Sequence, residues 1–209
     1  MKHFDEDRLD VLHALMRSHP LATLVTPTST ELLVDHLPLR LDAGDGPFGT
    51  LRGHVSRGNP LWRSLPGHVP SVAVFQGPQA YVSPSWYPSK HADGKAVPTW
   101  NYAVVHAHGV PRAIEDPQWL LQQLTLLTDQ HESFQALPWK VSDAPRDFID
   151  RLLGAIVGIE MPVTQLRGRW KVSQNRPLAD RLGVAAGLQS RDGDEAQAMA
   201  ALVMQRAVP

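Results

Sequence analysis

Cysteine is absent from this 209-residue chain. Its absence excludes disulfide bonds, thiolate zinc sites, Fe–S clusters and cysteine nucleophiles together. Long apolar runs are missing too, because the longest ones, such as residues 152–159, fall far short of the roughly 20 residues that a bilayer span requires. Charges and histidines in residues 1–20 interrupt the apolar block that a signal peptide needs. We therefore expect a cytoplasmic protein with no membrane partner.

Net charge of either sign is also missing, since 20 basic residues face 21 acidic ones. This balance argues against a protein that grips nucleic acid with its whole surface, although it permits a local basic patch. One such patch is residues 166–191, which hold six Lys or Arg and a single acid, Asp180. A composition with 43% hydrophobic and 20% charged residues predicts a globular domain rather than a disordered chain or a coiled coil.

Hydrophobic periodicity changes twice along the chain. Apolar residues recur at helical spacing within residues 5–18, so an amphipathic helix is expected there. Short β-like runs separated by Gly and Pro follow, and they cover residues 21–26, 31–41, 49–55, 71–75, 80–83 and 102–110. Helical patterns return at 117–134 and 145–153. Strands without regular helical crossovers predict a mainly β, α+β fold built on a compact antiparallel barrel with flanking helices.

Residues 154–175 allow two interpretations. Helices at 145–153 and 162–170 around a break at Gly158 would form a helix-turn-helix with a recognition helix. However, the apolar, β-branched start of this segment and the period-two alternation of polar and apolar residues over 165–172 favour strands. We therefore expect two further strands here.

Two short helical segments, 178–188 and 195–203, follow Pro177 with glycines between them. They would form a C-terminal appendage. The predicted organisation is a main domain over residues 1–175 and a helical appendage over residues 176–209.

Two motifs suggest chemistry that their context does not support. Residues 44–49 match G-x-G-x-x-G, but they contain Pro47 and lead into a β-like run rather than a helix, so we expect a hairpin turn. Histidines on strands, His36, His54, His106 and His108, invite a metal site. Three convergent ligands are not evident and HExxH is absent, so we expect no metal.

The segment Gly53–Trp62, GHVSRGNPLW, ends a predicted strand in polar residues. His54, Ser56 and Arg57 lie within four positions, next to a glycine that allows close backbone approach. These side chains suit a phosphomonoester, which carries nearly two negative charges. An equally weighted alternative is a solvated strand end with a helix cap at Asn59.

Aromatic and polar residues mix in two further segments, AYVSPSWY and VPTWNY. Trp86, Tyr87, Trp100 and Tyr102 fall within seventeen positions, among Ser, Thr and Asn rather than aliphatic residues. Flat rings combined with fixed hydrogen-bonding groups suit a planar heteroaromatic ligand. The third cluster, KVSQNR at residues 171–176, lies in the basic stretch 166–191. Three roles are open for that stretch: binding the phosphate of the ligand, binding a nucleic-acid backbone, or no binding role.

The segments GHVSRGNPLW, AYVSPSWY, VPTWNY with VHAHG, IVGIE and KVSQNR resemble, in this order and spacing, the FMN-binding negative transcriptional regulator family, also called PaiB-like. The resemblance extends to about residue 188. It implies that residues 1–175 form a six-stranded Greek-key split β-barrel, which dimerises and holds FMN in clefts between the subunits. It also implies that Ser56 and Arg57 bind the flavin phosphate, although the Lys that follows this pair in the wider superfamily is replaced by Gly58.

The polar and aromatic clusters together give the expected FMN-binding residues. They are His54, Ser56, Arg57, Asn59, Ser83, Ser85, Trp86, Tyr87, Thr99, Trp100, Asn101, Lys171, Gln174, Asn175 and Arg176. No catalytic residue is assigned.

Three function classes remain open from the sequence. The first is a homodimeric FMN-binding negative transcriptional regulator, the second is an FMN-dependent oxidoreductase of the split-barrel type, and the third is a flavin-free interaction dimer. The aromatic and polar clusters favour the first two and do not separate them. If the protein contacts DNA, we expect the contact to run through the basic residues 167–191.

Overall fold

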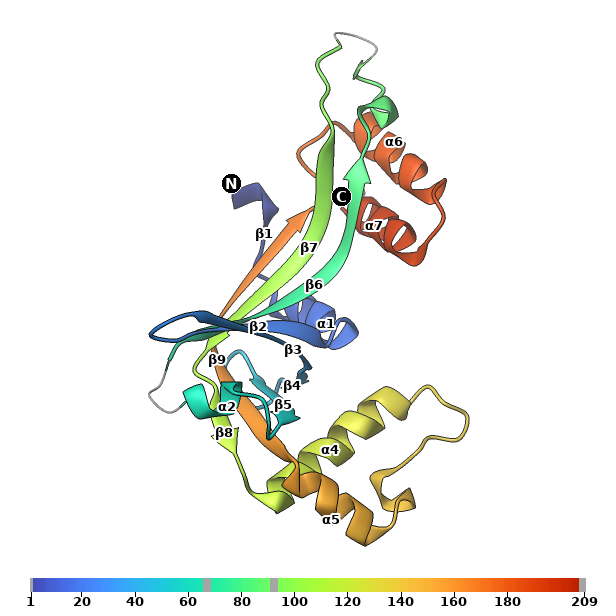
Figure 1. Ribbon diagram of the computed structural model, residues 1–209. Helices are drawn as coiled ribbons and strands as arrows, with labels where there is room; N and C mark the ends of the chain where they lie inside the picture. Colours follow the sequence, from blue (N-terminus) through green and yellow to red (C-terminus); the bar gives the residue numbers. More distant parts are fainter. Residues whose placement is uncertain (1, 66–68, 91–93, 207–209) are drawn as a thin grey trace. The chain divides into compact units, whose positions relative to one another are not determined.

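The computed structural model describes residues 2–65, 69–90 and 94–206. It is a mainly antiparallel sheet with flanking helices, as predicted (Figure 1). The strands are β1 (Asp5–Glu6), β2 (Leu21–Pro27), β3 (Leu32–Pro38), β4 (Arg40–Asp42), β5 (Thr50–Ser56), β6 (Ser71–Val82), β7 (Thr99–Gly109), β8 (Arg112–Ile114) and β9 (Ile156–Lys171). The helices are α1 (Leu9–Ser18), α2 (Leu61–Ser64), α4 (Pro117–Glu132), α5 (Arg146–Gly154), α6 (Leu178–Gln189) and α7 (Asp194–Gln205), with 3₁₀ turns η1 (Lys2–Phe4), η2 (Pro84–Trp86) and η3 (Val141–Asp143).

The strand order is β3-β2-β6-β7-β9-β5-β4, with β1 and β8 also paired to β9. The sheet thus has nine strands rather than the six that the family resemblance implied. Over the described residues the order runs from β3 to β4 without closing into a ring of paired strands. The extra strands are short, because β1, β4 and β8 have only two or three residues each.

The chain divides into two compact units. The first unit comprises residues 1–15, 76–105 and 167–209, and the second comprises residues 16–75 and 106–166. Helices α6 and α7 belong to the first unit, together with the end of β6 and the start of β7. The domain boundary expected after residue 175 stays a prediction.

The second unit contains the hairpins. β2 pairs with β3 in the register Leu24↔Asp35, and β4 pairs with β5 in the register Arg40↔Arg52. The turn between β4 and β5 contains the G-x-G-x-x-G match, and Gly46 and Gly49 have positive φ angles of 90° and 87°. The interpretation of this motif as a hairpin turn is therefore confirmed.

Two segments that were each expected to contain two strands form one continuous strand in the structure. Residues 71–82 form β6, which joins the runs predicted at 71–75 and 80–83 and ends before Ser83, and residues 156–171 form β9. The expected pairs of strands were therefore wrong, and the helix-turn-helix interpretation is excluded. The glycines that suggested breaks make room for neighbours instead. An added Cβ at Gly77 would lie 2.7 Å from Leu15 Cδ1, and one at Gly158 would lie 2.3 Å from Trp119 Cζ3.

Helical elements follow the predicted periodicity closely. α1 begins four residues later than the predicted helix, and α4 begins at Pro117 with the Asp116 side chain accepting a hydrogen bond from the Gln118 amide at 2.9 Å. In the described residues, no helix is long and apolar enough to span a membrane.

Candidate functional site

The end of β5 carries four of the expected ligand residues, all in the second unit. His54 is mostly covered, and burial lowers its pKa. Its Nδ1 is buried without a hydrogen-bond partner among the described residues. A neutral imidazole results at ordinary pH, so His54 adds no positive charge for a phosphate.

Arg57 is already bonded to the protein. Its Nε donates to the Gly154 carbonyl at 2.9 Å, Nη1 donates to Glu115 Oε2 at 2.6 Å, and Nη2 donates to the Ile156 carbonyl at 3.3 Å. Its guanidinium also lies over the Trp62 ring at 5.7 Å. These bonds use three of the five N–H groups of the side chain, so a phosphate bound here would share Arg57 with the Glu115 carboxylate.

Asn59 lies just before α2, where the alternative interpretation expected a helix cap, although the N-cap position itself is Pro60. Its Oδ1 accepts from the Leu61 amide at 2.7 Å at the start of α2, and its Nδ2 donates to Asp35 Oδ1 at 2.5 Å. Ser56 is exposed, and its Oγ accepts from the Gly58 amide at 3.3 Å. Both polar atoms of the Asn59 side chain are therefore engaged within the second unit.

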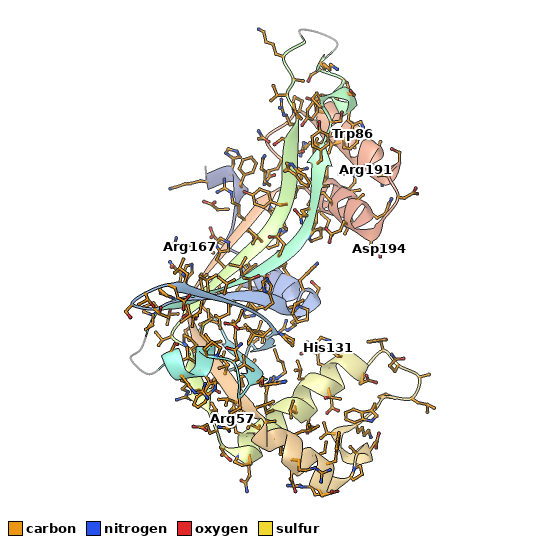
Figure 2. The ribbon with its side chains drawn as sticks, viewed as in Figure 1. Arg57, Trp86, His131, Arg167, Arg191 and Asp194 are labelled. Atoms are coloured by element: carbon orange, nitrogen blue, oxygen red, sulfur yellow. The ribbon has the colours of Figure 1, made fainter. Side chains whose placement is uncertain are left out.

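The remaining expected residues lie in the first unit. Ser83 caps η2 by accepting from the Ser85 amide at 3.2 Å. Trp86, labelled in Figure 2, packs against α6, because an added Cβ at Gly187 would come within 2.3–2.5 Å of three atoms of its ring. One face of this indole is thus covered by the helix rather than open to a ligand.

Tyr87 is a core residue with 1% of its surface exposed. The Arg176 guanidinium lies over its ring at 4.7 Å. Burial raises the pKa of Tyr87, and this effect outweighs the lowering by the positive charge of Arg176. The partly exposed Arg176 thus covers the ring of the buried Tyr87.

Hydrogen bonds tie the start of β7 to the segment after β9. Asn101 Nδ2 donates to Ser173 Oγ at 2.9 Å, and Lys171 Nζ donates to Thr99 Oγ1. Gln174 lies partly buried beside them, and its Oε1 accepts from the Val172 amide at 2.8 Å. The structure thus brings the predicted polar residues of these two segments together, while Asn175 is exposed to solvent.

Trp100 is the expected aromatic residue that solvent reaches best, with 53% of its surface exposed. Tyr81, 41% exposed, meets it edge to face with ring centroids 6.3 Å apart. Both rings line a pocket of about 280 Å³, whose other walls are Gln79, Ala80, Arg191, Asp192, Gly193, Glu195 and Ala196. The sequence selection missed Tyr81, although it lies in the quoted segment AYVSPSWY and alternates with the buried Ala80 and Val82.

Comparison with known proteins places this chain in a family. Residues 1–165 match the family model described as "Putative FMN-binding domain". The protease synthase and sporulation protein PAI 2 of Bacillus subtilis is 30% identical over 97% of this chain and 94% of its own length. The chain belongs to the FMN-binding, PaiB-like family. An uncharacterized protein of Emericella nidulans is 33% identical to this PaiB-like chain over 96% of it and 94% of the relative.

A solved structure supports the fold. The FAD and heme binding protein from Mycobacterium smegmatis superposes with a TM-score of 0.60, at 16% identity, over 80% of this PaiB-like chain and 73% of that chain. The likeness confirms the predicted fold class. The family model likewise supports FMN as the cofactor of this PaiB-like protein. In the described ranges, no group of three His, Asp or Glu side chains is arranged to hold a metal ion.

Proposed function

We propose that this protein binds FMN at the interface of a cytoplasmic homodimer and acts as a negative transcriptional regulator. The match of residues 1–165 to an FMN-binding domain carries the flavin part of this proposal, and the likeness to PaiB-like proteins with the basic residues 167–191 supports the regulator part. Bound FMN supplies redox chemistry, and the chain supplies binding and orientation.

The donor set of the chain fits a flavin mononucleotide. Trp100 offers a half-exposed ring beside a pocket, which suits contact with a planar ring system. Two sets of cations are candidates for the phosphate: Arg57 in the second unit, and Lys171 with Arg176 in the first. Experiments on Arg57 and its partner Glu115 distinguish these candidates.

We expect FMN to bind more tightly than riboflavin, and Arg57→Ala to weaken FMN binding by roughly ten- to a hundredfold, because charge-assisted bonds are worth about 1.5–3 kcal/mol each. Glu115→Gln is the informative second variant. It removes a carboxylate that competes for the Arg57 guanidinium 2.6 Å away, so FMN should bind severalfold more tightly. Titration followed by flavin fluorescence measures the affinities of the parent protein for FMN and riboflavin and of each variant for FMN.

Arg57→Ala also removes bonds to the Gly154 and Ile156 carbonyls, so its thermal midpoint is measured alongside. Riboflavin is the matched control ligand, since it lacks the phosphate. Its affinity should be the same for the parent protein and for both variants. If FMN affinity is unchanged in both variants, the phosphate does not bind Arg57. Lys171 and Arg176 then become the candidates.

For the regulator role, we expect duplex DNA to bind through the basic residues 167–191, with log affinity falling against log salt at a slope of about 0.9 per phosphate contact. Arg167, labelled in Figure 2, is exposed and is not among the residues that line the Trp100 pocket, so Arg167→Glu should weaken this binding and lower its salt slope by about one contact, without loss of FMN. Arg191 is unsuitable, because it lines that pocket. Arg181 is unsuitable, because its Nη1 donates to the Arg206 carbonyl at 2.6 Å. Fluorescence anisotropy of labelled duplex, on the dimer fraction identified by light scattering, makes the measurement.

The charge-matched control is Arg146→Glu on the exposed face of α5. The rest of the chain should contribute little, because outside residues 166–191 only 14 basic residues face 20 acidic ones. Absence of salt-sensitive duplex binding by the parent protein would contradict the regulator role. Rapid bleaching of the flavin by NAD(P)H in that case would favour the oxidoreductase.

A further inference from the structure

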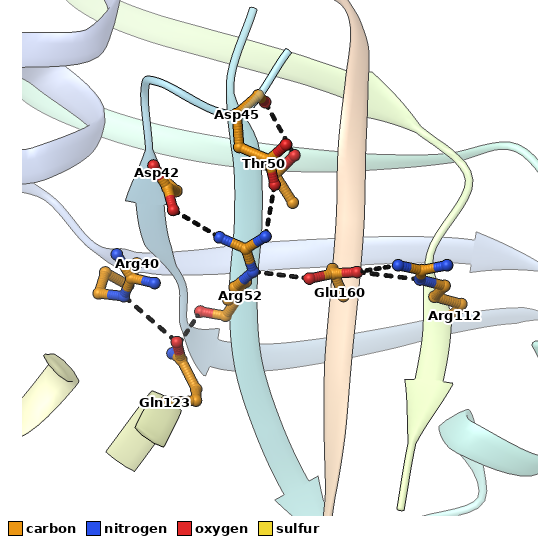
Figure 3. Close-up of polar contacts among 8 residues, drawn as sticks. All are labelled: Arg40, Asp42, Asp45, Thr50, Arg52, Arg112, Gln123 and Glu160. Carbon is orange, nitrogen blue, oxygen red and sulfur yellow. Dashed lines mark hydrogen bonds and ion pairs between the residues drawn. The ribbon is translucent and has the colours of Figure 1, made fainter. Parts of the chain in front are cut away.

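A second pocket lies in the second unit, outside both sets of expected flavin residues. Its volume is about 330 Å³. It is lined by Arg40, Asp42, Arg52, Trp119, Gln122, Gln123 and Leu126. Figure 3 shows the polar contacts around it, where the strands β4, β5 and β9 lie beside α4.

Two arginines stand directly opposite each other in this pocket. Arg40 on β4 pairs in register with Arg52 on β5. Like charges at such cross-strand positions are destabilising unless they are compensated. The positive charge of Arg52 is neutralised by ion pairs with three carboxylates, those of Asp42 and Glu160 at 2.6 Å and that of Asp45.

Arg40 has a different environment. Its Nε donates to Gln123 Oε1 at 3.2 Å, which is a neutral acceptor, and no ion pair joins Arg40 to a carboxylate among the described residues. Burial lowers the pKa of Arg40, an effect that the nearby Asp42 charge opposes and the Arg52 charge reinforces. The guanidinium is therefore partly buried without direct neutralisation by a carboxylate of the described residues.

Gln123 fixes the orientation of Arg40. It is 2% exposed, and its Nε2 donates to the Arg52 carbonyl at 3.0 Å while its Oε1 receives Arg40 Nε. This arrangement holds one edge of the guanidinium, and within residues 2–65, 69–90 and 94–206 its two terminal amino groups have no hydrogen-bond acceptor, so they can take one from a ligand. Two parallel N–H donors in a fixed plane match the two oxygens of a carboxylate.

We propose that this pocket binds a small organic monocarboxylate, with the carboxylate on the terminal amino groups of Arg40 and the apolar part against Trp119 and Leu126. A single negative charge is favoured over a polyphosphate, because the Asp42 carboxylate also lines the pocket. The volume is at the lower end of the roughly 300–1,000 Å³ typical of ligand sites, so a ligand with one ring fits the space.

The test uses the full-length protein as purified, with its flavin content recorded. Isothermal titration with sodium benzoate is compared with sodium acetate and inorganic phosphate. We expect benzoate to bind more tightly than acetate, which lacks the ring, and more tightly than phosphate. Arg40→Gln should weaken benzoate binding at least about tenfold, and Arg40→Lys should fall between, because it keeps the charge and loses the planar fork.

Leu126→Glu gives a variant that does not depend on Arg40. Leu126 is 40% exposed on α4, so a carboxylate there should leave the fold intact and repel benzoate, again with at least about tenfold weaker binding. Arg146→Gln, an exposed arginine on α5, is the matched control and should bind benzoate as the parent does. Thermal midpoints of all variants verify folding.

Three outcomes would overturn the proposal: no benzoate binding by the parent protein, unchanged affinity in both Arg40→Gln and Leu126→Glu, or tighter binding of phosphate than of benzoate. FMN titration of Arg40→Gln separates this inference from the proposed function. Unchanged FMN affinity is expected. A loss of FMN binding would assign Arg40 to the flavin phosphate, which overturns the second site and leaves the FMN-binding function standing.

Discussion

Replacing Gly183 with alanine is expected to lower the free energy of unfolding by about 3 kcal/mol, at the upper end of the usual range for overpacking. Gly183 lies inside α6, where alanine would otherwise favour the helix by about 0.5–1 kcal/mol. However, an added Cβ at this position would lie 2.1 Å from the Trp86 carbonyl oxygen and 3.2 Å from Pro88 Cδ. Backbone atoms cannot rotate away, so α6 must separate from η2.

The matched control is Gly154→Ala in α5. An added Cβ there meets nothing within 4 Å, so this variant should be neutral or up to about 1 kcal/mol more stable. Urea unfolding followed by far-UV circular dichroism measures both changes. Equal effects of the two substitutions would show that α6 does not pack against η2 as described.

This contact explains why the role of Trp86 could be predicted only in part from the sequence. Aromatic rings among serines are typical of a ligand site, and that pattern predicted a flavin contact for Trp86. The structure packs the indole against α6, a distant segment of the chain, where Gly183 and Gly187 stand four apart and leave room for it. Glycines at this spacing within a predicted helix are a signal for close packing.

Hydrophobic periodicity predicted the helices, because the pattern that specifies a helix lies within one short stretch of sequence. The apolar spacing in α1 and the Asp-Pro start of α4 were sufficient for both helices. Strand continuity in β6 and β9 was not predictable in the same way, because Gly77 and Gly158 are indistinguishable in sequence from glycines in turns. Their neighbours, Leu15 and Trp119, come from distant segments.

Ion pairs between residues far apart in the chain also could not be predicted from the sequence. Arg57 was expected to be available for a phosphate, yet its partner Glu115 lies 58 residues away along the chain. Glu160 was quoted only as the last letter of IVGIE. In the structure it is 4% exposed and joins Arg52 and Arg112 (Figure 3).

Glu160→Gln is expected to lower the free energy of unfolding by about 3–5 kcal/mol at neutral pH, the usual cost of breaking a buried ion pair on one side. Glu160 Oε2 accepts from Arg52 Nε at 2.6 Å, and Oε1 accepts from Arg112 Nε at 2.9 Å. A neutral amide loses both charge-assisted bonds and turns an NH₂ group toward cationic donors. Chemical denaturation at pH 7 measures the change.

Asp147→Asn is the control, because Asp147 pairs with Arg151 at 2.8 Å on an exposed face of α5. Exposed pairs of this kind contribute about 0.3–0.5 kcal/mol, so the control should remain close to the parent. Similar losses in the two variants would show that the Glu160 pairs are no stronger than surface pairs.

The effect of Glu160→Gln should also depend on pH in a defined direction. Burial raises the pKa of Glu160, but the hydrogen bonds and charges of Arg52 and Arg112 outweigh it and hold the pKa below its ordinary value of 4.5. A carboxyl whose pKa is lower in the folded state stabilises the fold fully above its unfolded pKa, and this stabilisation is lost as the pH falls through the folded-state pKa. The difference in unfolding free energy between parent and variant should therefore be constant from pH 7 to about 5 and shrink below the ordinary pKa of the carboxyl group.

The pKa of Glu6 is also lowered, so protonation of Glu6 in acid destabilises the parent and the variant alike. This contribution cancels in the difference between the two proteins. A difference that grows as the pH falls below 4.5 would mean that Glu160 is protonated more readily in the folded protein than in the unfolded chain.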